Sequence, residues 1–427
     1  NSRQAKVLLN GTYPPFSGQE AKTQINASAG ENGTVTIRDR DERIVMQKNE
    51  IELIPADRAN DFFSLSDIRI GIRFHWERLQ TLSFRGGILF SPNQDGTISA
   101  FNLIGLEDYL SSVISSEMSA GAPPEFLKVQ AVTARSWLVA MLEKKKTPRA
   151  VQGGGENEIL VWQDVNDHEG FDVCADDHCQ RYQGIARIIS ENVARAINDT
   201  RGLFLTHEGR ICDARYSKCC GGRTEVFATA WENAHFPYLA GINDSDRESS
   251  PLATEAHVKS WLLSNPEAYC NTTDESLLGQ ILPSFDLETK NFYRWRVVYT
   301  AQELTAILRE KSGIDFGALK RIEALERGAS GRISRLKIEG TRRTVTVGKE
   351  LEIRRWLSPT HLLSSAFVVS AQHDAAGDIS HLTLDGGGWG HGVGLCQIGA
   401  AVMAARGFKS EDILAHYFRG AVLKKLY

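Results

Sequence analysis

Short stretches rich in β-forming residues fill roughly the first hundred positions of the chain. They are separated by Gly, Asn and Asp, and they read TVTIRD, IELIPA, DIRIGIRF, LQTLSF and GTISAF. This pattern predicts a series of short strands up to about residue 105. Apolar positions then recur at helical spacing in LEDYLSSVISSEM and PPEFLKVQAVTARSWLVAML, which predicts two consecutive helices.

The second half of the chain mixes both kinds of pattern. AQELTAILREK predicts a helix, RISRLKIEG and TVTVG predict strands, and AAVMAARG and SEDILAHYFRG predict two final helices. We expect the last helix to start at a Ser410 cap and to stop at Gly420. The fold class predicted is α+β. Its expected parts are a β-rich N-terminal extension (1–66), a mixed core (67–251 and 367–427) with a central helical pair, and an inserted α+β module (252–366).

Composition narrows the class of protein without naming a function. The chain has 427 residues, 42% hydrophobic and 24% charged, as in an ordinary soluble globular protein, and a net charge of -4. A net charge of this sign does not indicate a surface that binds nucleic acid or anionic lipid. No apolar run approaches the length of a membrane-spanning helix, and we expect no membrane span in this chain. The start at Asn1 is compatible with a leader that has been removed.

A glutamate stands on the apolar face of the first predicted helix. Leu110, Val113, Ile114 and Glu117 fall at i, i+3, i+4 and i+7, which places them on one face. Desolvation disfavours the charged form of a carboxylate, so such a group can donate a proton to a leaving oxygen and later take one back. The alternative is a glutamate at the edge of the stripe that reaches water or pairs with a lysine.

Two cations lie on the next predicted helix. Lys128 and Arg135 are seven residues apart and share a face, with small residues between them. These two cations could pair with a buried acid or bind polar groups of a substrate. The alternative is a solvated basic edge.

Histidine and cysteine are concentrated in DHEGFDVCADDHCQRYQG. The four candidate ligands there are His168, Cys174, His178 and Cys179, whose residue types suit a structural tetrahedral zinc. Their spacing matches no common zinc finger. A Cys174–Cys179 disulfide or a plain polar loop are the alternatives.

Two further stretches combine cysteine with glycine. YSKCCGGRTE contains Cys219 and Cys220, which the sequence leaves open as ligands, thiols or disulfide partners of Cys212 or Cys396. GGGWGHGVGLCQIGA (386–400) has neither the spacing of a dinucleotide-binding loop nor that of a P-loop. We interpret it as a loop whose backbone approaches a ligand closely, and we do not expect it to hold the metal.

Taken in order, these motifs resemble the family of stage II sporulation protein D and the amidase enhancers. LEDYLSSVISSEM, PPEFLKVQAVTARSW, YSKCCGGRTE, GWGHGVGLCQIGAAVMAARG and ILAHYF carry the resemblance, which runs from about residue 67 to the C-terminus. It implies an extracytoplasmic lytic transglycosylase that cleaves the MurNAc–GlcNAc β-1,4 bond of glycan strands, stripped of stem peptides, and leaves 1,6-anhydro ends.

The resemblance also assigns residues. The family's catalytic glutamate falls on Glu117, its helix cations on Lys128 and Arg135, and the zinc site of some members on the region of His168, Cys174, His178 and Cys179. Tyr216, Trp389 and His391 are candidates for contacting the sugar, although both aromatic residues suit a core equally well.

Departures from the family pattern leave one alternative function open. Ser119 replaces the family's proline after Glu-Met, and Cys219, Cys220 and Cys396 stand where Ser or Thr is frequent. The alternative is a non-catalytic protein that binds peptidoglycan and stimulates a separate cell-wall amidase.

Overall fold

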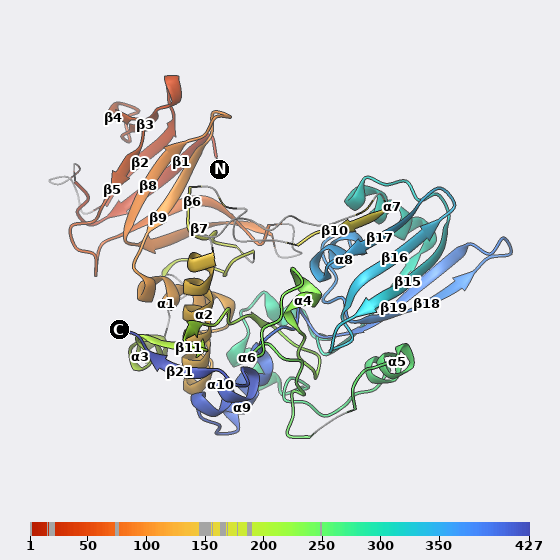
Figure 1. The fold of residues 1–427 in the computed structure, drawn as a ribbon. Helices are drawn as coiled ribbons and strands as arrows, with labels where there is room; N and C mark the ends of the chain where they lie inside the picture. Colours follow the sequence, from red (N-terminus) through yellow and green to blue (C-terminus); the bar gives the residue numbers. More distant parts are fainter. Residues whose placement is uncertain are drawn as a thin grey trace. The chain divides into compact units, whose positions relative to one another are not determined.

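The computed structural model describes residues 2–14, 16, 22–72, 77–144, 155, 157–162, 168, 170–176, 178–185, 190–247 and 250–427. The chain forms two compact units. Unit 1 comprises residues 1–120 and 168–197, and unit 2 comprises residues 121–167 and 198–427. Helices and several separate sheets are both present (Figure 1), so the predicted α+β class is confirmed.

Unit 1 is built on a six-stranded antiparallel sheet in the order β4-β3-β2-β1-β6-β7. A second, three-stranded sheet has the order β5-β8-β9. The strand bounds are β1 Gln4–Asn10, β2 Lys22–Ala29, β3 Val35–Arg38, β4 Ile44–Lys48, β5 Ile51–Leu53, β6 Phe62–Ile70, β7 Arg78–Arg85, β8 Gly87–Pro92 and β9 Ile98–Leu103. The short 3-10 helix η1 covers Glu31–Gly33, and helix α1 covers Leu106–Glu117.

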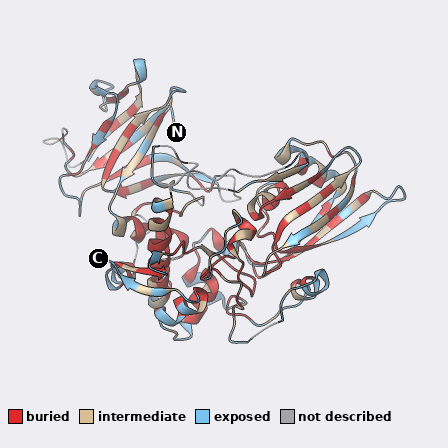
Figure 2. Ribbon diagram, viewed as in Figure 1, coloured by how far each residue is buried: buried red, intermediate tan, exposed pale blue. Residues whose placement is uncertain are grey.

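Alternating side chains explain why these segments become strands. In β1, Val7 and Leu9 are buried while their sequence neighbours are partly or fully exposed, as a half-buried sheet requires. Strand β5 alternates in the same way, with Ile51 and Leu53 buried and Glu52 exposed, and Figure 2 shows buried and exposed residues interspersed in this sheet region. The sequence pattern predicted β3, β5, β7 and β9 correctly but missed β1, β2, β4 and β8.

Unit 2 begins with the long helix α2 (Pro124–Lys144) and contains four small sheets, ordered β10-β17-β16-β15, β12-β11-β21, β13-β20 and β14-β19-β18. Their strands are β10 Glu158–Leu160, β11 Leu203–His207, β12 Arg210–Ile211, β13 Tyr216–Ser217, β14 Arg294–Thr300, β15 Leu319–Arg327, β16 Ile333–Gly340, β17 Thr344–Gly348, β18 Phe367–His373, β19 Ile379–Gly387, β20 Leu395–Cys396 and β21 Val422–Lys425. The remaining helices are α4 Phe227–Ala230, α5 Glu255–Leu263, α6 Glu275–Ile281, η4 Asp286–Glu288, α7 Ala301–Ser312, α8 Glu350–Trp356, α9 Gln397–Ala405 and α10 Ser410–Tyr417. Helix α3 (Glu191–Asp199) spans the point at which the chain returns from unit 1 to unit 2.

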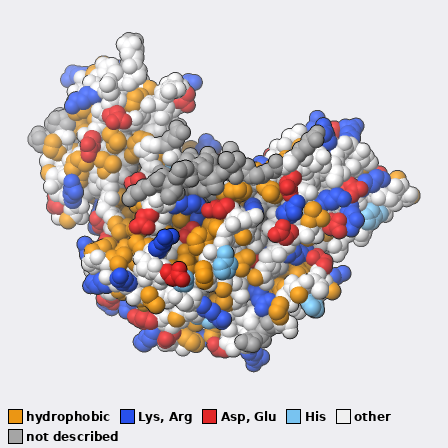
Figure 3. Space-filling model, in the orientation of Figure 1, with side chains coloured by type: hydrophobic (Ala, Val, Ile, Leu, Met, Phe, Trp, Pro, Cys, Tyr) orange, Lys and Arg blue, Asp and Glu red, His pale blue; other side chains and the backbone are white. Residues whose placement is uncertain are grey.

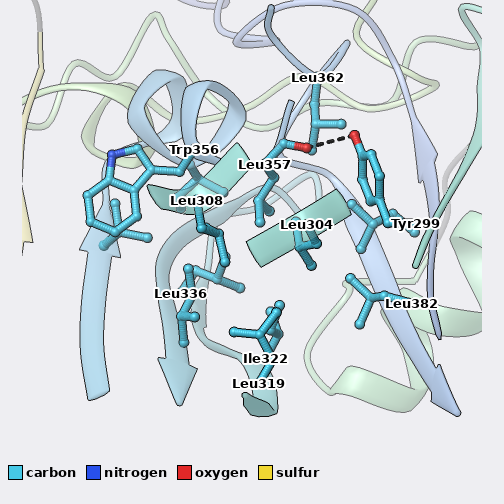
Figure 4. Close-up of a cluster of buried hydrophobic side chains, with 14 of the residues drawn as sticks. Tyr299, Leu304, Leu308, Leu319, Ile322, Leu336, Trp356, Leu357, Leu362 and Leu382 are labelled. Atoms are coloured by element: carbon cyan, nitrogen blue, oxygen red, sulfur yellow. Dashed lines mark hydrogen bonds between the residues drawn. The ribbon is translucent and has the colours of Figure 1, made fainter. Parts of the chain in front are cut away.

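One hydrophobic core of unit 2 lies where α7 and α8 pack against the sheets of β14 to β19. Leu304 and Leu308 of α7, Leu336 of β16 and Leu382 of β19 point into it (Figure 4). The hydroxyl of Tyr299 donates to the carbonyl of Leu357 at 2.8 Å, so its one polar atom is satisfied inside the core. These strands and α7 agree with the patterns that predicted the inserted module. The boundaries of this module and of the other expected parts stay a prediction.

The start of the last helix corrects the sequence analysis. The cap of α10 is Lys409, and Ser410 is the first helical residue, with no side-chain cap bond at the helix start. The carboxylate of Glu125 on α2 accepts the backbone N–H of Ser410 at 2.8 Å instead. A long-range acceptor therefore replaces the local cap, and the helix ends at Tyr417, before Gly420.

The surface of unit 2 carries charges of both signs in close succession. Ion pairs such as Arg321–Glu323 and Lys337–Glu339 lie on the sheet of β15 and β16. Basic side chains (blue) and acidic side chains (red) are mixed over its visible face in Figure 3. None of the helices in the described part of the chain is long and apolar enough to cross a membrane.

Candidate functional site

Glu117 is the last residue of α1 and lies on its buried face. Leu110, Val113 and Ile114 are fully buried, and Glu117 is 7% exposed, which confirms that the four residues share one face. The carboxylate Oε1 accepts the backbone N–H of Arg181 at 2.9 Å. The acid is therefore held by a backbone donor, in an environment that largely excludes water.

Polar side chains of α1 fix the segment that contacts the acid. The hydroxyl of Ser112 donates to the carbonyl of Gly184 at 2.8 Å, and the backbone N–H of Gln183 donates to the hydroxyl of Ser116 at 3.2 Å. One turn further back, the ring of Tyr109 stacks on that of Tyr182 at 5.0 Å. Residues 181–184 thus lie along α1 and present the Arg181 amide to Glu117.

The histidine and cysteine side chains predicted as ligands converge in unit 1. One ligand atom from each of His168, Cys174, His178 and Cys179 lies within 4.8 Å of all the others. His168 Nε2 is 3.0 Å from both Cys179 Sγ and His178 Nδ1, and Cys174 Sγ is 3.9 Å from His178 Nδ1. Hydrogen bonding, first of all with Cys179, lowers the pKa of the Cys174 thiol. All seven cysteines are described and none is in a disulfide, so the group is able to hold a metal ion.

Only a short length of chain separates the four predicted metal ligands from the residue that binds Glu117. Cys179 is two residues before Arg181, and Tyr182 N–H donates to the carbonyl of Ala175 inside the same loop at 3.0 Å. A metal that orders this loop would therefore also order the amide that binds Glu117.

The predicted helix cations have different surroundings within unit 2. Lys128 is partly exposed and pairs with Glu125 at 3.1 Å and with Asp199 at 3.3 Å, and the hydrogen bond that it donates to Glu125 raises the pKa of Lys128. Arg135 is fully buried, and its guanidinium donates to the carbonyl of Leu203 at the start of β11 at 3.2 Å. The described contact of Arg135 is thus with the backbone of a neighbouring strand.

The two glycine-containing motifs of unit 2 meet. Strands β13 and β20 pair in parallel, with Tyr216 opposite Leu395, and Cys219 and Trp389 exchange backbone hydrogen bonds of 3.0 and 2.7 Å. Tyr216 and Trp389 are both partly exposed. The structure thus brings these two predicted sugar-contacting residues onto adjoining segments.

Arg332 locks the two segments together, and the sequence analysis did not identify it. It is fully buried, and its guanidinium donates to the carbonyl of Gly390 at 3.0 Å and to that of Cys220 at 3.1 Å. A Cβ added to Gly392 would stand 2.4 Å from this guanidinium. The space beside this glycine is therefore filled by the protein's own arginine.

We expect the glycine at position 394 to be essential for stability. Gly394 has φ +73°, and an added Cβ would meet the Arg215 carbonyl oxygen at 2.2 Å, whereas Gly377 has φ +77° and open space around it. Gly377→Ala should therefore cost only the conformational penalty, about 1 kcal/mol, and Gly394→Ala roughly 3 kcal/mol or more. Urea denaturation of both variants measures this difference. Equal destabilisation would show that the close contact relaxes without cost.

His391 lies between the two segments as a neutral imidazole. Its Nδ1 accepts the N–H of Val393 at 3.0 Å, and it makes a second hydrogen bond with the backbone of Tyr216. Burial, and after it the charge of Arg215, lowers the pKa of His391 well below its usual value. The imidazole thus bonds the backbone of both segments, which is the turn-stabilising role that histidine often has in such a loop.

His391 should make folding stability sensitive to mild acid. Because its folded-state pKa is depressed, the unfolded chain takes up this proton first, and stability falls as the pH drops below about 6.5. This contribution has a slope of at most about 1.4 kcal/mol per pH unit. We expect His391→Asn to lose less unfolding free energy than wild type between pH 7.5 and pH 5, measured by urea titration at each pH. Parallel curves for the two proteins would contradict the assignment.

Comparison with known proteins shows which families this chain is similar to. Residues 94–207 match the family model described as Stage II sporulation protein, and residues 225–394 match one described as a domain of unknown function (DUF8618). The first range contains Glu117 and the four histidine and cysteine ligands, and the second contains His391.

Individual relatives extend the similarity over most of the chain. An uncharacterized protein of Brachyspira hyodysenteriae is 25% identical over 342 residues, covering 80% of this chain and 72% of the relative. Stage II sporulation protein D of Bacillus amyloliquefaciens is 25% identical, covering 74% of this chain and 73% of the relative. The Amidase enhancer of Bacillus subtilis is 26% identical over 74% of this chain, but the match covers only 40% of the relative. The resemblance to the stage II sporulation protein D and amidase enhancer family is therefore confirmed.

Proposed function

We propose that this protein is a lytic transglycosylase that cleaves the MurNAc–GlcNAc β-1,4 bond of denuded peptidoglycan strands. The observation that carries the proposal is the position of Glu117, a buried carboxylate at the end of α1 that is held by the Arg181 amide. Relatives named for sporulation and for amidase enhancement support a role in the cell wall. Action on that substrate places the protein outside the cytoplasm.

A single carboxyl group is sufficient for this reaction. Glu117 first donates its proton to the glycosidic oxygen, and the GlcNAc leaves with that oxygen as a hydroxyl. The C6 hydroxyl of the MurNAc ring then bonds to the anomeric carbon, and the Glu117 carboxylate takes the hydroxyl proton, which restores the acid. Hydrolytic glycosidases need a second carboxyl group because water replaces this internal nucleophile.

The remaining predicted residues have proposed roles that follow from their exposure. Lys128, Tyr216 and Trp389 are partly exposed and are suited to contact sugar hydroxyls and ring faces. Arg135 and His391 hold backbone in the described structure, so we assign them to positioning the binding segments.

Zinc is the proposed occupant of the unit 1 ligand group. Two imidazoles and two thiolates are a ligand set that zinc accepts in tetrahedral geometry. His168, Cys174, His178 and Cys179 would use all four positions, which leaves none for substrate, so the ion would have a structural role. Its contribution is to hold the loop that carries the Arg181 amide.

The alternative function is a peptidoglycan-binding enhancer of a cell-wall amidase, suggested by the name of one relative. Purified protein should be incubated with denuded glycan strands, and the products identified by mass spectrometry. Anhydro-ended fragments support the proposal, and reducing-end fragments would indicate hydrolysis instead. Intact strands, together with faster release of stem peptides by an added amidase from peptidoglycan that still carries them, would favour the enhancer.

A further inference from the structure

A second group of metal-ligating side chains lies in unit 2. Cys220 follows β13, Asp244 and Cys270 lie in connecting segments, and Cys396 ends β20 directly before α9. One ligand atom of each is within 4.8 Å of all the others, and the exposed fraction of each residue is at most 2%. The group thus brings together four segments that are far apart in the sequence.

The sulfur separation suits a shared metal ion. Cys220 Sγ and Cys270 Sγ are 3.7 Å apart. Two thiolates bound tetrahedrally at about 2.3 Å from zinc are separated by roughly 3.8 Å, whereas sulfurs in a disulfide are about 2.05 Å apart. The pair therefore has the spacing of two ligands of one ion.

Neighbouring donors orient two of the proposed ligands. The backbone N–H of Cys220 donates to Cys396 Sγ at 3.2 Å, which stabilises a thiolate. Asp244 Oδ2 accepts the N–H of Cys270 at 2.8 Å, and its Oδ1 accepts the hydroxyl of Tyr417 at 2.5 Å. Each carboxylate oxygen keeps a free lone pair for a metal. Such outer donors are typical of protein metal sites.

Close packing leaves the Asp244 carboxylate no room to move. Gly399 on α9 lies against it, and a Cβ there would stand 2.5 Å from Asp244 Oδ1 and 2.4 Å from the Tyr417 hydroxyl. The carboxylate is therefore fixed beside the three thiols.

The buried carboxyl group of Asp244 has no basic side chain paired with it in the described part of the chain. Asp244 is fully buried, and among the described residues no Lys, Arg or His lies within ion-pair distance of it. The nearby basic side chains are used elsewhere: Lys218 pairs with Asp286 at 2.9 Å, and Arg332 binds backbone carbonyls. Buried charges in proteins are paired or coordinate metals.

We propose that Cys220, Asp244, Cys270 and Cys396 bind a second structural zinc ion. Binding would release the three thiol protons and leave three thiolates and one carboxylate around the ion. The thiol of Cys219 contacts those of Cys270 and Cys396. We place Cys219 beside the ligand set, because Cys220 is the residue that groups with Asp244, Cys270 and Cys396. The sequence analysis did not expect the 386–400 stretch to contribute a metal ligand, and Asp244 and Cys270 carried no signal in it.

Metal content of the full chain tests this site. Purified wild-type protein should contain two zinc ions per chain, Cys179→Ser should retain one, and Cys396→Ser should also retain one. Cys212→Ser is the matched control, because Cys212 is a buried cysteine of unit 2 outside the group, and it should retain two. One zinc in the wild type that disappears in Cys179→Ser would overturn the proposal, and this comparison does not depend on the folding of the Cys396 variant.

Mass spectrometry of the denatured, metal-free chain separates the site from a disulfide. All seven thiols should react with an alkylating reagent without prior reduction. A chain that takes up two alkyl groups fewer and is two hydrogen atoms lighter, with Cys220 and Cys270 unmodified, would overturn the proposal. Zinc content is independent of glycan cleavage, so this result stands or fails separately from the transglycosylase assignment.

Discussion

Glu117→Gln is expected to lower the rate of anhydro-end formation by roughly 10²–10⁴-fold, the usual contribution of a general acid–base group. The amide has nearly the same shape as the carboxyl group, and its oxygen can still accept the Arg181 N–H that Oε1 accepts at 2.9 Å. It has no proton to give to the leaving oxygen. The variant should therefore fold and bind glycan but release almost no product in a timed digestion analysed by mass spectrometry.

Asp108→Asn is the matched control for this prediction. Asp108 is an exposed carboxylate in the first turn of the same helix, so its variant removes an equal charge away from the acid. Thermal melts of both variants should lie near that of wild type. Undiminished cleavage by Glu117→Gln would mean that another group supplies the proton.

Cys179→Ser is expected to release the unit 1 zinc and to lower glycan cleavage by about 10- to 100-fold. The ligand is two residues from Arg181, so loss of the ion should loosen the segment along α1 and withdraw the amide from Glu117. Hydrogen exchange followed by mass spectrometry should show faster exchange at residues 180–184.

The contrast with Cys212→Ser makes this result specific. Cys212 is more deeply buried than Cys179, and it belongs to unit 2 and to neither ligand group. Its variant should keep both the metal and the slow exchange at residues 180–184. Full activity of metal-depleted Cys179→Ser would show that the ion has no part in positioning the acid.

Features set by neighbours along the chain could be predicted from the sequence. The Leu110, Val113, Ile114 and Glu117 face follows from helical spacing alone, and His168 to Cys179 are close because they share one loop. Both features are properties of segments about a dozen residues long. Their predicted places agree with the structure, while their chemical roles stay predictions.

Features that depend on distant partners could not be predicted. The start of α10 was placed wrongly at a serine cap because the acceptor for the Ser410 amide comes from Glu125, 285 residues earlier. Arg332 and Asp244 stand in unremarkable sequence, and only the folded chain brings them to the two cysteine-containing segments. The glycines between residues 386 and 394 indicated that another group lies close to this backbone. The sequence could not show that the buried guanidinium of Arg332 is one of those groups.

The pairing of β13 with β20 also determines when unit 2 can complete its fold. Cys220 and Cys396, which adjoin these strands, are 176 residues apart, and Thr206 of β11 bonds Val422 of β21 across 216 residues. Closing loops of this length costs chain entropy before any contact repays it, which makes such folding slow. The two segments remain apart until synthesis has reached residue 396, so Cys219 and Cys220 lack their folded neighbours throughout that interval.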